Sequence, residues 1–430
     1  MEDPNNSDLW QASIALSKGA STVENVHNLL IVGAGAAGLA AGIYGGRARL
    51  DTLILEKGPV GGTAYSTREL ANYPGFHADG ISGPYLMKEM EAHAKKFGCE
   101  IQREKIVDMD LEGDIKVVRG KKGAEYKAEA VILAFGTEPR LLDIPGERRL
   151  RGSGVSYCAT CDAENYDGEI VAVLGNGDAA LEEAMYIAKF ATKVIVIVIH
   201  DEGIVDCNRI SAEKAFKHPK LEFVWNSTLQ EIQGEEEVES IVIRNLKTGE
   251  CTERKVGGVF FYVGLVPQTA PVQGKVEMNP QGYIITNERM ETSIPGVYAV
   301  GDCISKYLRQ VVTATADGAI AAVAAEKYLE EAKEYREIMR SEAKVLLAFW
   351  SPTNQVSIDA LALAEPLLAG CGNRVKLVKI DMYRKTMMAR KLNVASPGTF
   401  VLLDKGKPCG LVDSSSQDGL RTTLKEWTTV

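Results

Sequence analysis

The chain has 430 residues, of which 45% are apolar and 25% are charged, so a disordered chain is excluded. Its formal net charge of −9, without a basic cluster, argues against nucleic acid as the main partner. No apolar run approaches the roughly 18 residues of a membrane span, so we expect no membrane association.

Residues 1–27 lack hydrophobic periodicity, and we expect a tail there. The tail begins acidic and polar and does not resemble a secretory signal peptide. We therefore expect a cytoplasmic protein, or one from a compartment derived from a cytoplasm. The length predicts about two to four domains.

The first regular pattern is a strand, a Gly-rich turn and a helix. Residues 28–32 form a short apolar run typical of a buried parallel strand, and residues 36–47 read as a helix of small residues. The GxGxxG turn at 33–38 lies between them, and a second strand at 52–55 ends at Glu56. Glycines let a pyrophosphate approach the helix N-terminus, while the acid is placed to hold a ribose hydroxyl. The pattern predicts dinucleotide binding.

Two of the eight cysteines, Cys158 and Cys161, form a CxxC that is followed by Asp162. Eight cysteines are too few for a secreted disulfide framework, so redox or metal chemistry is favoured. Zinc would require a second CxxC or histidines at ligand spacing; the five histidines lack it, and we expect no metal. The spacing permits a disulfide across one helical turn, and Asp162 is placed to give protons to a leaving thiolate. A reduced structural pair is the alternative.

The strand–turn–helix pattern recurs with a strand at 170–174 and a helix at 179–190. The GxGxxA turn between them makes Gly175, Gly177 and Ala180 candidates for binding a nicotinamide nucleotide. A retained fold whose nucleotide site is weak or lost is the alternative. Two βαβ units imply two nucleotide-type domains, or a duplication of one.

Further strands are expected at 130–134 and 296–300. From residue 318 to 340 a helix of small residues grades into a charged one, which marks a linker helix. A smaller α/β domain follows, with strands expected at 344–349, 375–380 and 399–403 and helices around 359–369 and 385–391.

Four motifs occur in a fixed order: ELANYPGF at 69–76, VSYCATCD at 155–162, TSIPGVYAVGDC at 292–303 and RQVVTATADGAIAA at 309–322. Together they resemble low-molecular-weight thioredoxin reductase over residues 28–329. The resemblance implies an α/β flavoprotein with two Rossmann-like domains, in which the FAD domain is split by an NAD(P)-type domain that carries the CxxC. It also implies a homodimer whose domains rotate, with hinges near 140–154 and 270–285.

The expected domain plan follows from this resemblance. It comprises a tail (1–27), the first part of the FAD domain (28–145), the NAD(P)-type domain (146–280), the second part of the FAD domain (281–330), a linker helix (331–342) and a thioredoxin-like domain (343–430).

The resemblance also assigns roles to residues. The FAD contacts that it implies are Gly33, Gly35, Ala36, Gly38, Glu56, Lys57, Gly62, Asn72, Val107, Ala134, Gly136, Asp302, Arg309, Gln310 and Val311. The cysteine matching Cys161 faces the flavin, the one matching Cys158 attacks the substrate disulfide, and the acid matching Asp162 protonates the departing thiolate. The implied partner is thioredoxin or a thioredoxin-like disulfide protein.

Two departures from the family pattern change the expected function. The family's NADPH signature is HRR followed by an arginine, but residues 198–200 read Val-Ile-His and residues 203–205 contain no arginine. Losing charge-assisted bonds to the 2′-phosphate disfavours NADPH, which leaves NADH and ferredoxin as rival donors.

The second departure is in the C-terminal domain, which resembles thioredoxin but carries residues 354–357 as Asn-Gln-Val-Ser in place of CGPC. This domain is therefore expected to be redox-inactive. A redox sensor or scaffold whose C-terminal domain binds a partner is the alternative function, and an internal lid over the groove for thioredoxin is a further hypothesis.

Overall fold

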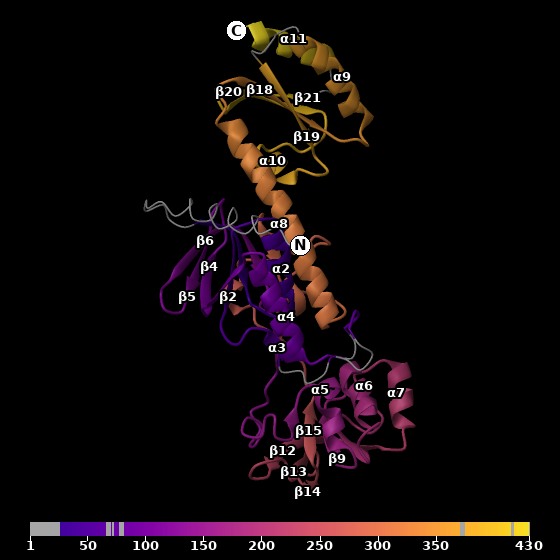
Figure 1. Cartoon of the computed structure of the whole chain (residues 1–430). Coiled ribbons are helices and arrows are strands. Elements are labelled where there is room, and N and C mark those ends of the chain that lie inside the picture. The colour runs from indigo at the N-terminus through magenta and orange to yellow at the C-terminus, as the bar shows by residue number, and fades with distance from the viewer. Residues whose placement is uncertain are drawn as a thin grey trace.

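The computed structural model describes residues 26–65, 70, 73–76, 81–369, 375–413 and 417–429. In this part of the chain the elements form three bodies in a row (Figure 1). The first domain lies in the middle, the domain that carries the CxxC lies at one end, and the C-terminal domain lies at the other. None of the described helices combines the length and apolar character that a membrane crossing requires.

The first domain is built on a seven-stranded sheet in the order β3-β2-β1-β6-β5-β4, with β17 also paired to β6. Its strands are β1 (Val26–Val32), β2 (Thr52–Glu56), β3 (Glu100–Arg103), β4 (Ile106–Asp110), β5 (Lys116–Gly120), β6 (Glu125–Leu133) and β17 (Val297–Ala299). Helices α2 (Ala36–Arg47), α3 (Gly62–Tyr65), α4 (Gly83–Lys96) and the first half of α8 (Val311–Met339) accompany it. Strands β1, β2, β3, β6 and β17 run parallel, whereas β4 and β5 add an antiparallel meander.

Both faces of the central strands are buried, which explains their continuous apolar sequence. Leu29 and Ile31 of β1 pack with the cluster that includes helices α2, α4 and α8. Leu30 and Val32 point to the other face and pack with residues of the meander. The parallel strands therefore end together at one edge, where the Gly-rich turn lies.

The second domain has a parallel five-stranded sheet in the order β11-β10-β9-β15-β8. Its strands are β8 (Val155–Ser156), β9 (Ile170–Leu174), β10 (Lys193–Ile197), β11 (Leu221–Val224) and β15 (Gly258–Phe261), and a separate antiparallel sheet holds β12 (Ser227–Gln233), β13 (Ser240–Asn245) and β14 (Cys251–Lys255). Its helices are α5 (Ala159–Asp162), η1 (Ala163–Tyr166), α6 (Asp178–Ile187) and α7 (Arg209–Phe216).

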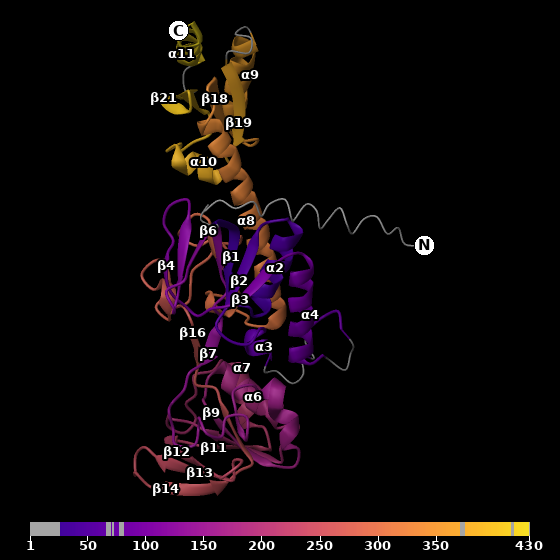
Figure 2. The same ribbon diagram turned by 60° about the vertical axis from the view of Figure 1, so that its left-hand side comes forward.

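The two domains are joined by a pair of antiparallel strands, β7 (Thr137–Pro139) and β16 (Leu265–Pro267). Figure 2 shows this pair between the two bodies. After β16 the chain enters η2 (Ala270–Val272), and Val272 and Val276 are buried in the core of the first domain. The return to the first domain therefore comes before the predicted boundary at residue 280, and the connecting strands precede the predicted hinge segments.

Helix α8 is a single helix of 29 residues, so the structure has no separate linker helix at 331–342. Its first half packs Ala321 and Ala325 into the first domain, and Ile338 near its end is buried in the C-terminal domain. That domain contains a sheet in the order β19-β18-β20-β21. Its elements are β18 (Lys344–Trp350), α9 (Gln355–Ala369), β19 (Val375–Asp381), α10 (Thr386–Lys391), β20 (Thr399–Asp404), β21 (Lys407–Asp413) and α11 (Gln417–Thr429).

Polar contacts fix the C-terminal domain to α8. The buried Glu331 accepts a hydrogen bond from the Met388 backbone nitrogen at 2.8 Å, and Glu334 forms an ion pair with Lys385. Figure 1 places this domain at the end of the molecule opposite the CxxC domain. The lid hypothesis is therefore wrong for the CxxC of the same chain.

Candidate active site

The Gly-rich turn of the first domain is tightly packed on one side and open on the other. Gly33 has a φ of +112°, and a Cβ atom there would lie 2.2 Å from the Ala134 carbonyl oxygen. A Cβ on Gly38 would lie 1.9 Å from the Gly33 oxygen. A Cβ on Gly35, by contrast, would meet nothing nearer than the Gly62 Cα at 4.0 Å. The fold thus requires two of these glycines, while Gly35 keeps space open beside the turn.

Helix α2 begins at Ala36, and its N-cap, Gly35, has no side chain to cap it. A helix N-terminus of this kind has backbone N–H groups available for an anion. Glu56 ends β2, where its Oε2 accepts from the Ala34 nitrogen at 2.7 Å and its Oε1 from the Gly58 nitrogen at 2.8 Å. These bonds hold the carboxylate against the turn, where its remaining lone pairs can accept hydroxyl groups.

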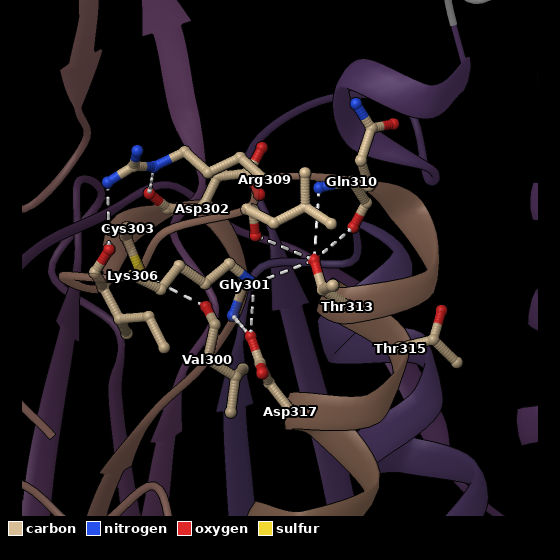
Figure 3. Close-up of polar contacts among 12 residues, drawn as sticks. Val300, Gly301, Asp302, Cys303, Lys306, Arg309, Gln310, Thr313, Thr315 and Asp317 are labelled. Carbon is tan, nitrogen blue, oxygen red and sulfur yellow. Dashed lines mark hydrogen bonds and ion pairs between the residues drawn. The ribbon is translucent and has the colours of Figure 1, made fainter. Parts of the chain in front are cut away.

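Asp302 lies in η3 (Gly301–Cys303), directly after β17 (Figure 3). Among the described residues, its Oδ1 is the buried side-chain oxygen that has no hydrogen-bond partner. Burial raises the pKa of this carboxyl, although Lys306 and Arg309 oppose the shift. Nearby Asp317 does have partners, since its Oδ2 accepts from the Gly301 nitrogen at 3.0 Å and from Lys306 at 2.6 Å. A buried acceptor without a donor indicates a partner from outside the chain.

The start of α8 borders the same place. Arg309 lies with its guanidinium 4.2 Å from the centre of the Tyr283 ring and donates to the Asp302 carbonyl oxygen at 3.2 Å. Gln310 is the N-cap of α8 and forms a capping box with Thr313. Val311 is the first residue of the helix. The structure therefore brings these residues to the same edge as Asp302.

The remaining predicted contacts are spread around this edge. Gly62 begins α3 beside the Gly-rich turn, and Ala134 and Gly136 follow β6, with Gly136 at a φ of +65°. Lys57 pairs with Glu138 at 2.7 Å in an exposed position. Val107 lies where the β4–β5 register shifts and is 47% exposed. Asn72 lies outside the described residues.

These features fit FAD. The open Gly-rich turn suits a pyrophosphate, Glu56 suits a ribose hydroxyl, and the unpartnered Asp302 suits a hydroxyl donor such as those of the ribityl chain.

The CxxC lies at the start of α5 in the second domain, with Cys158 between β8 and α5 and Cys161 within α5. Cys158 is the N-cap of α5 and is disulfide-bonded; the side chain of Cys161 lies outside the described ones. The Ala159 nitrogen, at the start of α5, donates to the Tyr262 hydroxyl at 2.7 Å. Asp162 ends α5, and its Oδ2 accepts a 2.6 Å hydrogen bond from Ser156.

An acidic side chain lies beside the second Gly-rich turn. The backbone packs closely around Gly175, because a Cβ there would lie 2.5 Å from the Tyr262 carbonyl oxygen. A Cβ on Gly177, by contrast, would meet nothing within 4 Å. Asp206 folds back onto this turn, where its nitrogen donates to the Asn176 oxygen at 3.0 Å and its carboxylate accepts from the Asn176 amide at 3.1 Å. His200 binds the same carboxylate at 3.0 Å and lowers the pKa of Asp206. An ionised acid therefore lies beside the turn.

Further contacts around this turn involve Ala180 and two more acidic residues. Ala180 is buried in the core of the second domain, so its role is packing of α6 against the sheet. Asp178, at the start of α6, accepts from both the backbone and the side-chain nitrogen of Asn208 at 2.7 Å. Asp201 forms an ion pair with Lys247.

Ser156 is part of the VSYCATCD motif, but the motif assigned it no role, and Tyr262 and Asp206 lie outside the four motifs. Each acts on a motif residue through a contact that the fold creates. For Ser156 a weak signal existed, because a serine two residues before a cysteine at a strand end is placed for a local side-chain-to-backbone bond.

Known proteins resemble this chain over most of its length. A family model described as pyridine nucleotide-disulphide oxidoreductase matches residues 27–318. A thioredoxin reductase of Peptoclostridium acidaminophilum is 51% identical over 314 residues, which span 72% of this chain and 98% of that protein. A bifunctional thioredoxin reductase/thioredoxin of Mycobacterium leprae is 33% identical over 431 residues, which span 90% of this chain and 93% of that protein. The crystal structure of thioredoxin reductase from Streptococcus pyogenes matches with a TM-score of 0.62 at 40% identity, covering 72% of this chain and 99% of that one.

Proposed function

The chain belongs to the thioredoxin reductase family, and we propose that it passes electrons through a Cys158–Cys161 disulfide to the disulfide of a thioredoxin-like protein. The observation that carries the proposal is the disulfide-bonded Cys158, which lies one helical turn from Asp162 in the domain beside the dinucleotide cradle.

Thioredoxin reductases bind FAD, and the cradle of this chain fits it. The residues that we propose to hold FAD are Gly33, Gly35, Ala36, Gly38, Glu56, Lys57, Gly62, Asn72, Val107, Ala134, Gly136, Asp302, Arg309, Gln310 and Val311. When bound, FAD supplies the two electrons that reduce the CxxC disulfide.

The reduced CxxC would react by thiol–disulfide exchange. The Cys158 thiolate attacks one sulfur of the partner disulfide, which forms a mixed disulfide and releases one partner thiolate. Asp162 gives that thiolate a proton. The Cys161 thiol then gives up its proton to solvent and attacks the Cys158 sulfur, which restores the intramolecular disulfide and releases the second partner sulfur as a thiolate that takes a proton from solvent. Two electrons have then moved from the chain to its partner.

For the electron donor we propose NADH or a reduced ferredoxin rather than NADPH. Asp206 and Asp178 put negative charge beside the second Gly-rich turn, where a 2′-phosphate would need cations. Gly177 leaves space in front of this turn, so the less charged NADH is the remaining nucleotide candidate.

Rapid mixing of the oxidised FAD-loaded protein with NADH, NADPH or reduced ferredoxin tests the donor. We expect the flavin absorbance to fall with either NADH or reduced ferredoxin. It should stay unchanged with NADPH at micromolar concentrations. Gly177→Ala is the matched variant, because its φ of −83° and open surroundings tolerate a Cβ atom. It should slow reduction by NADH and leave reduction by ferredoxin unchanged. Rapid reduction by micromolar NADPH would refute the assignment.

The attacking cysteine is tested by trapping. Cys161→Ser should accumulate a mixed disulfide between Cys158 and a thioredoxin, since the resolving thiol is absent. Cys158→Ser should trap nothing and lose turnover. If neither variant traps a partner and the unmodified protein reduces no thioredoxin-like disulfide, the sensor or scaffold function is favoured instead.

We also propose that the protein is a homodimer and that its C-terminal domain takes no part in electron relay. Tyr44 on α2 and Ile320 and Val323 on α8 are exposed apolar side chains of the first domain, as a subunit interface would require. Light scattering after gel filtration tests the dimer; a monomer at micromolar concentration would contradict it.

For the C-terminal domain, the cysteines are the evidence. This domain retains only Cys371 and Cys409, which do not form a CxxC.

A further inference from the structure

The hydroxyl of Ser156 connects Asp162 to the backbone of the attacking cysteine. Ser156 ends β8 and is 4% exposed. Its Oγ donates to Asp162 Oδ2 at 2.6 Å and accepts from the Cys158 nitrogen at 3.1 Å. The Cys158 carbonyl oxygen is a second acceptor for the same hydroxyl at 3.3 Å. One buried hydroxyl therefore has two alternative acceptors and one fixed donor.

The two acceptors correspond to the two protonation states of Asp162. When Asp162 is ionised, Ser156 donates its hydrogen to the carboxylate, a charge-assisted bond. When Asp162 is protonated, the carboxyl can donate to the Ser156 oxygen, and the serine hydrogen then turns to the Cys158 carbonyl. The contact between Ser156 and Asp162 persists in both states, so the carboxyl need not rotate when it gains or loses a proton.

We propose that Ser156 is a positioning residue that holds Asp162 in place while Asp162 exchanges protons with the thiols. The inference rests on the proposed function of Asp162. Asp162 takes the proton of the Cys158 thiol before the attack and gives it to the departing partner thiolate. The number of protons is unchanged, and the Ser156 hydrogen turns from Asp162 to the Cys158 carbonyl and back.

Neighbouring groups do not replace this arrangement. Tyr262 and Tyr166 both interact with Asp162, and burial raises the pKa of each, that of Tyr166 to about 12. Both phenols therefore remain neutral at physiological pH. Glu183 on α6 and Glu237 add negative charge around these tyrosines, and burial raises the pKa of Glu183. Ser156 is the neighbour that donates a hydrogen bond directly to the carboxylate among the contacts described.

The test is a single turnover that requires no electron donor. The protein is reduced with dithiothreitol, freed of the reductant by gel filtration and mixed with oxidised thioredoxin from about pH 5 to 9. The extent to which Cys158 is alkylated in a brief reaction is measured in parallel at each pH by mass spectrometry. Ser156→Ala is compared with Ser156→Thr, which keeps the hydroxyl, and with Ser227→Ala, a buried serine of β12 whose hydroxyl bonds only to the Trp225 oxygen among the contacts described.

In Ser156→Ala the ionised carboxylate loses its donor, so the acid limb of the rate profile should move upward by about one pH unit. The rate on the acid side then falls about tenfold, which corresponds to the lower end for a bond to a charged group. The alkylation profile of Cys158 should shift with it. Ser156→Thr and Ser227→Ala should behave as the unmodified protein, and equal melting temperatures exclude unfolding as the cause.

An equal loss of rate at every pH in Ser156→Ala, or an unshifted profile, would overturn the positioning role. Asp162→Asn separates this result from failure of the proposed function. If Asp162→Asn abolishes the acid limb while Ser156→Ala leaves it in place, only the role of Ser156 is wrong. If Asp162→Asn leaves rate and profile unchanged, the role of Asp162 is wrong, and the inference about Ser156 is wrong with it.

Discussion

Asp302 offers the sharpest test of the cofactor cradle, because its replacement should have opposite effects on the empty and the loaded protein. Its Oδ1 is buried and without a hydrogen bond, and such a group costs about 1–3 kcal/mol in the folded state. Asp302→Ala removes that cost and should raise the free energy of unfolding of the apoprotein by about 1 kcal/mol.

Binding of FAD should respond in the other direction. A hydrogen bond to a charged acceptor contributes about 1.5–3 kcal/mol, so its loss should weaken FAD binding by roughly 10- to 150-fold. Quenching of flavin fluorescence on titration into the apoprotein measures this affinity, and urea unfolding followed by circular dichroism measures the stability.

The stability difference should also depend on pH. Burial raises the pKa of Asp302 in the folded protein, so the folded state holds its proton more strongly than the unfolded chain. The penalty for the buried charge is then absent below the unfolded value of about 3.9 and complete above the raised folded value. The stability gain of Asp302→Ala should accordingly be present at neutral pH and vanish as the pH falls through this window.

Asp317 is the matched control from the same surroundings. It is paired with Lys306, and both side chains are largely buried, so Asp317→Ala leaves that cation without its partner. The apoprotein should then lose about 3 kcal/mol of stability. If Asp302→Ala destabilises the apoprotein as Asp317→Ala does and binds FAD with unchanged affinity, Asp302 has a structural role and the reasoning is refuted.

Three further variants test the fold around the site. Lys116 is fully buried, and burial lowers its pKa to about 8; Lys116→Met should stabilise the protein by about 2 kcal/mol at pH 7 in urea unfolding, and the gain should shrink above pH 8 as the lysine becomes neutral. An undiminished gain at high pH would contradict the buried charge. Gly33→Ala would force a Cβ against the Ala134 oxygen and should cost about 3 kcal/mol or more, seen as loss of soluble protein and of bound flavin. Glu331→Ala removes the acceptor for the Met388 nitrogen and should speed limited proteolysis of the C-terminal domain about tenfold, whereas Glu331→Gln, which keeps an acceptor oxygen, should not.

The sequence was sufficient where a segment's environment is reflected in its own residues. Strand β1 was predicted at 28–32 and extends over Val26–Val32, because both faces of a central parallel strand are buried and its apolar run is continuous. Helix α2 was predicted with its observed bounds, Ala36–Arg47, because its small residues follow the Gly-rich turn directly. Glycine and alanine are the residues that allow a helix to pack closely against a neighbouring backbone. The Gly-rich turn therefore carried most of the information about the cofactor cradle.

Where neighbours far along the chain decide the structure, the sequence was insufficient. Strand β14 (Cys251–Lys255) is exposed at every position, so it has no apolar alternation to detect. The sequence predicts a domain boundary at residue 280, which is too late. Val272 and Val276 are buried only because they pack against the first domain, and no local pattern shows this packing. Asp206 reaches the second Gly-rich turn through a loop whose path no local pattern specifies.

Helix α8 limits the role that the C-terminal domain can have. It begins beside Asp302. Two turns further on, a Cβ on Gly318 would lie 2.1 Å from the Ala37 carbonyl oxygen, so the first half of the helix must pack closely on α2. Ile338 in its last turn is buried in the C-terminal domain, and its 29 residues span about 43 Å. A continuous helix that is packed at both ends holds the C-terminal domain away from the cradle of its own chain. We therefore propose that any contribution of that domain to disulfide exchange is made to another molecule, as a recognition surface for a second copy or for a partner.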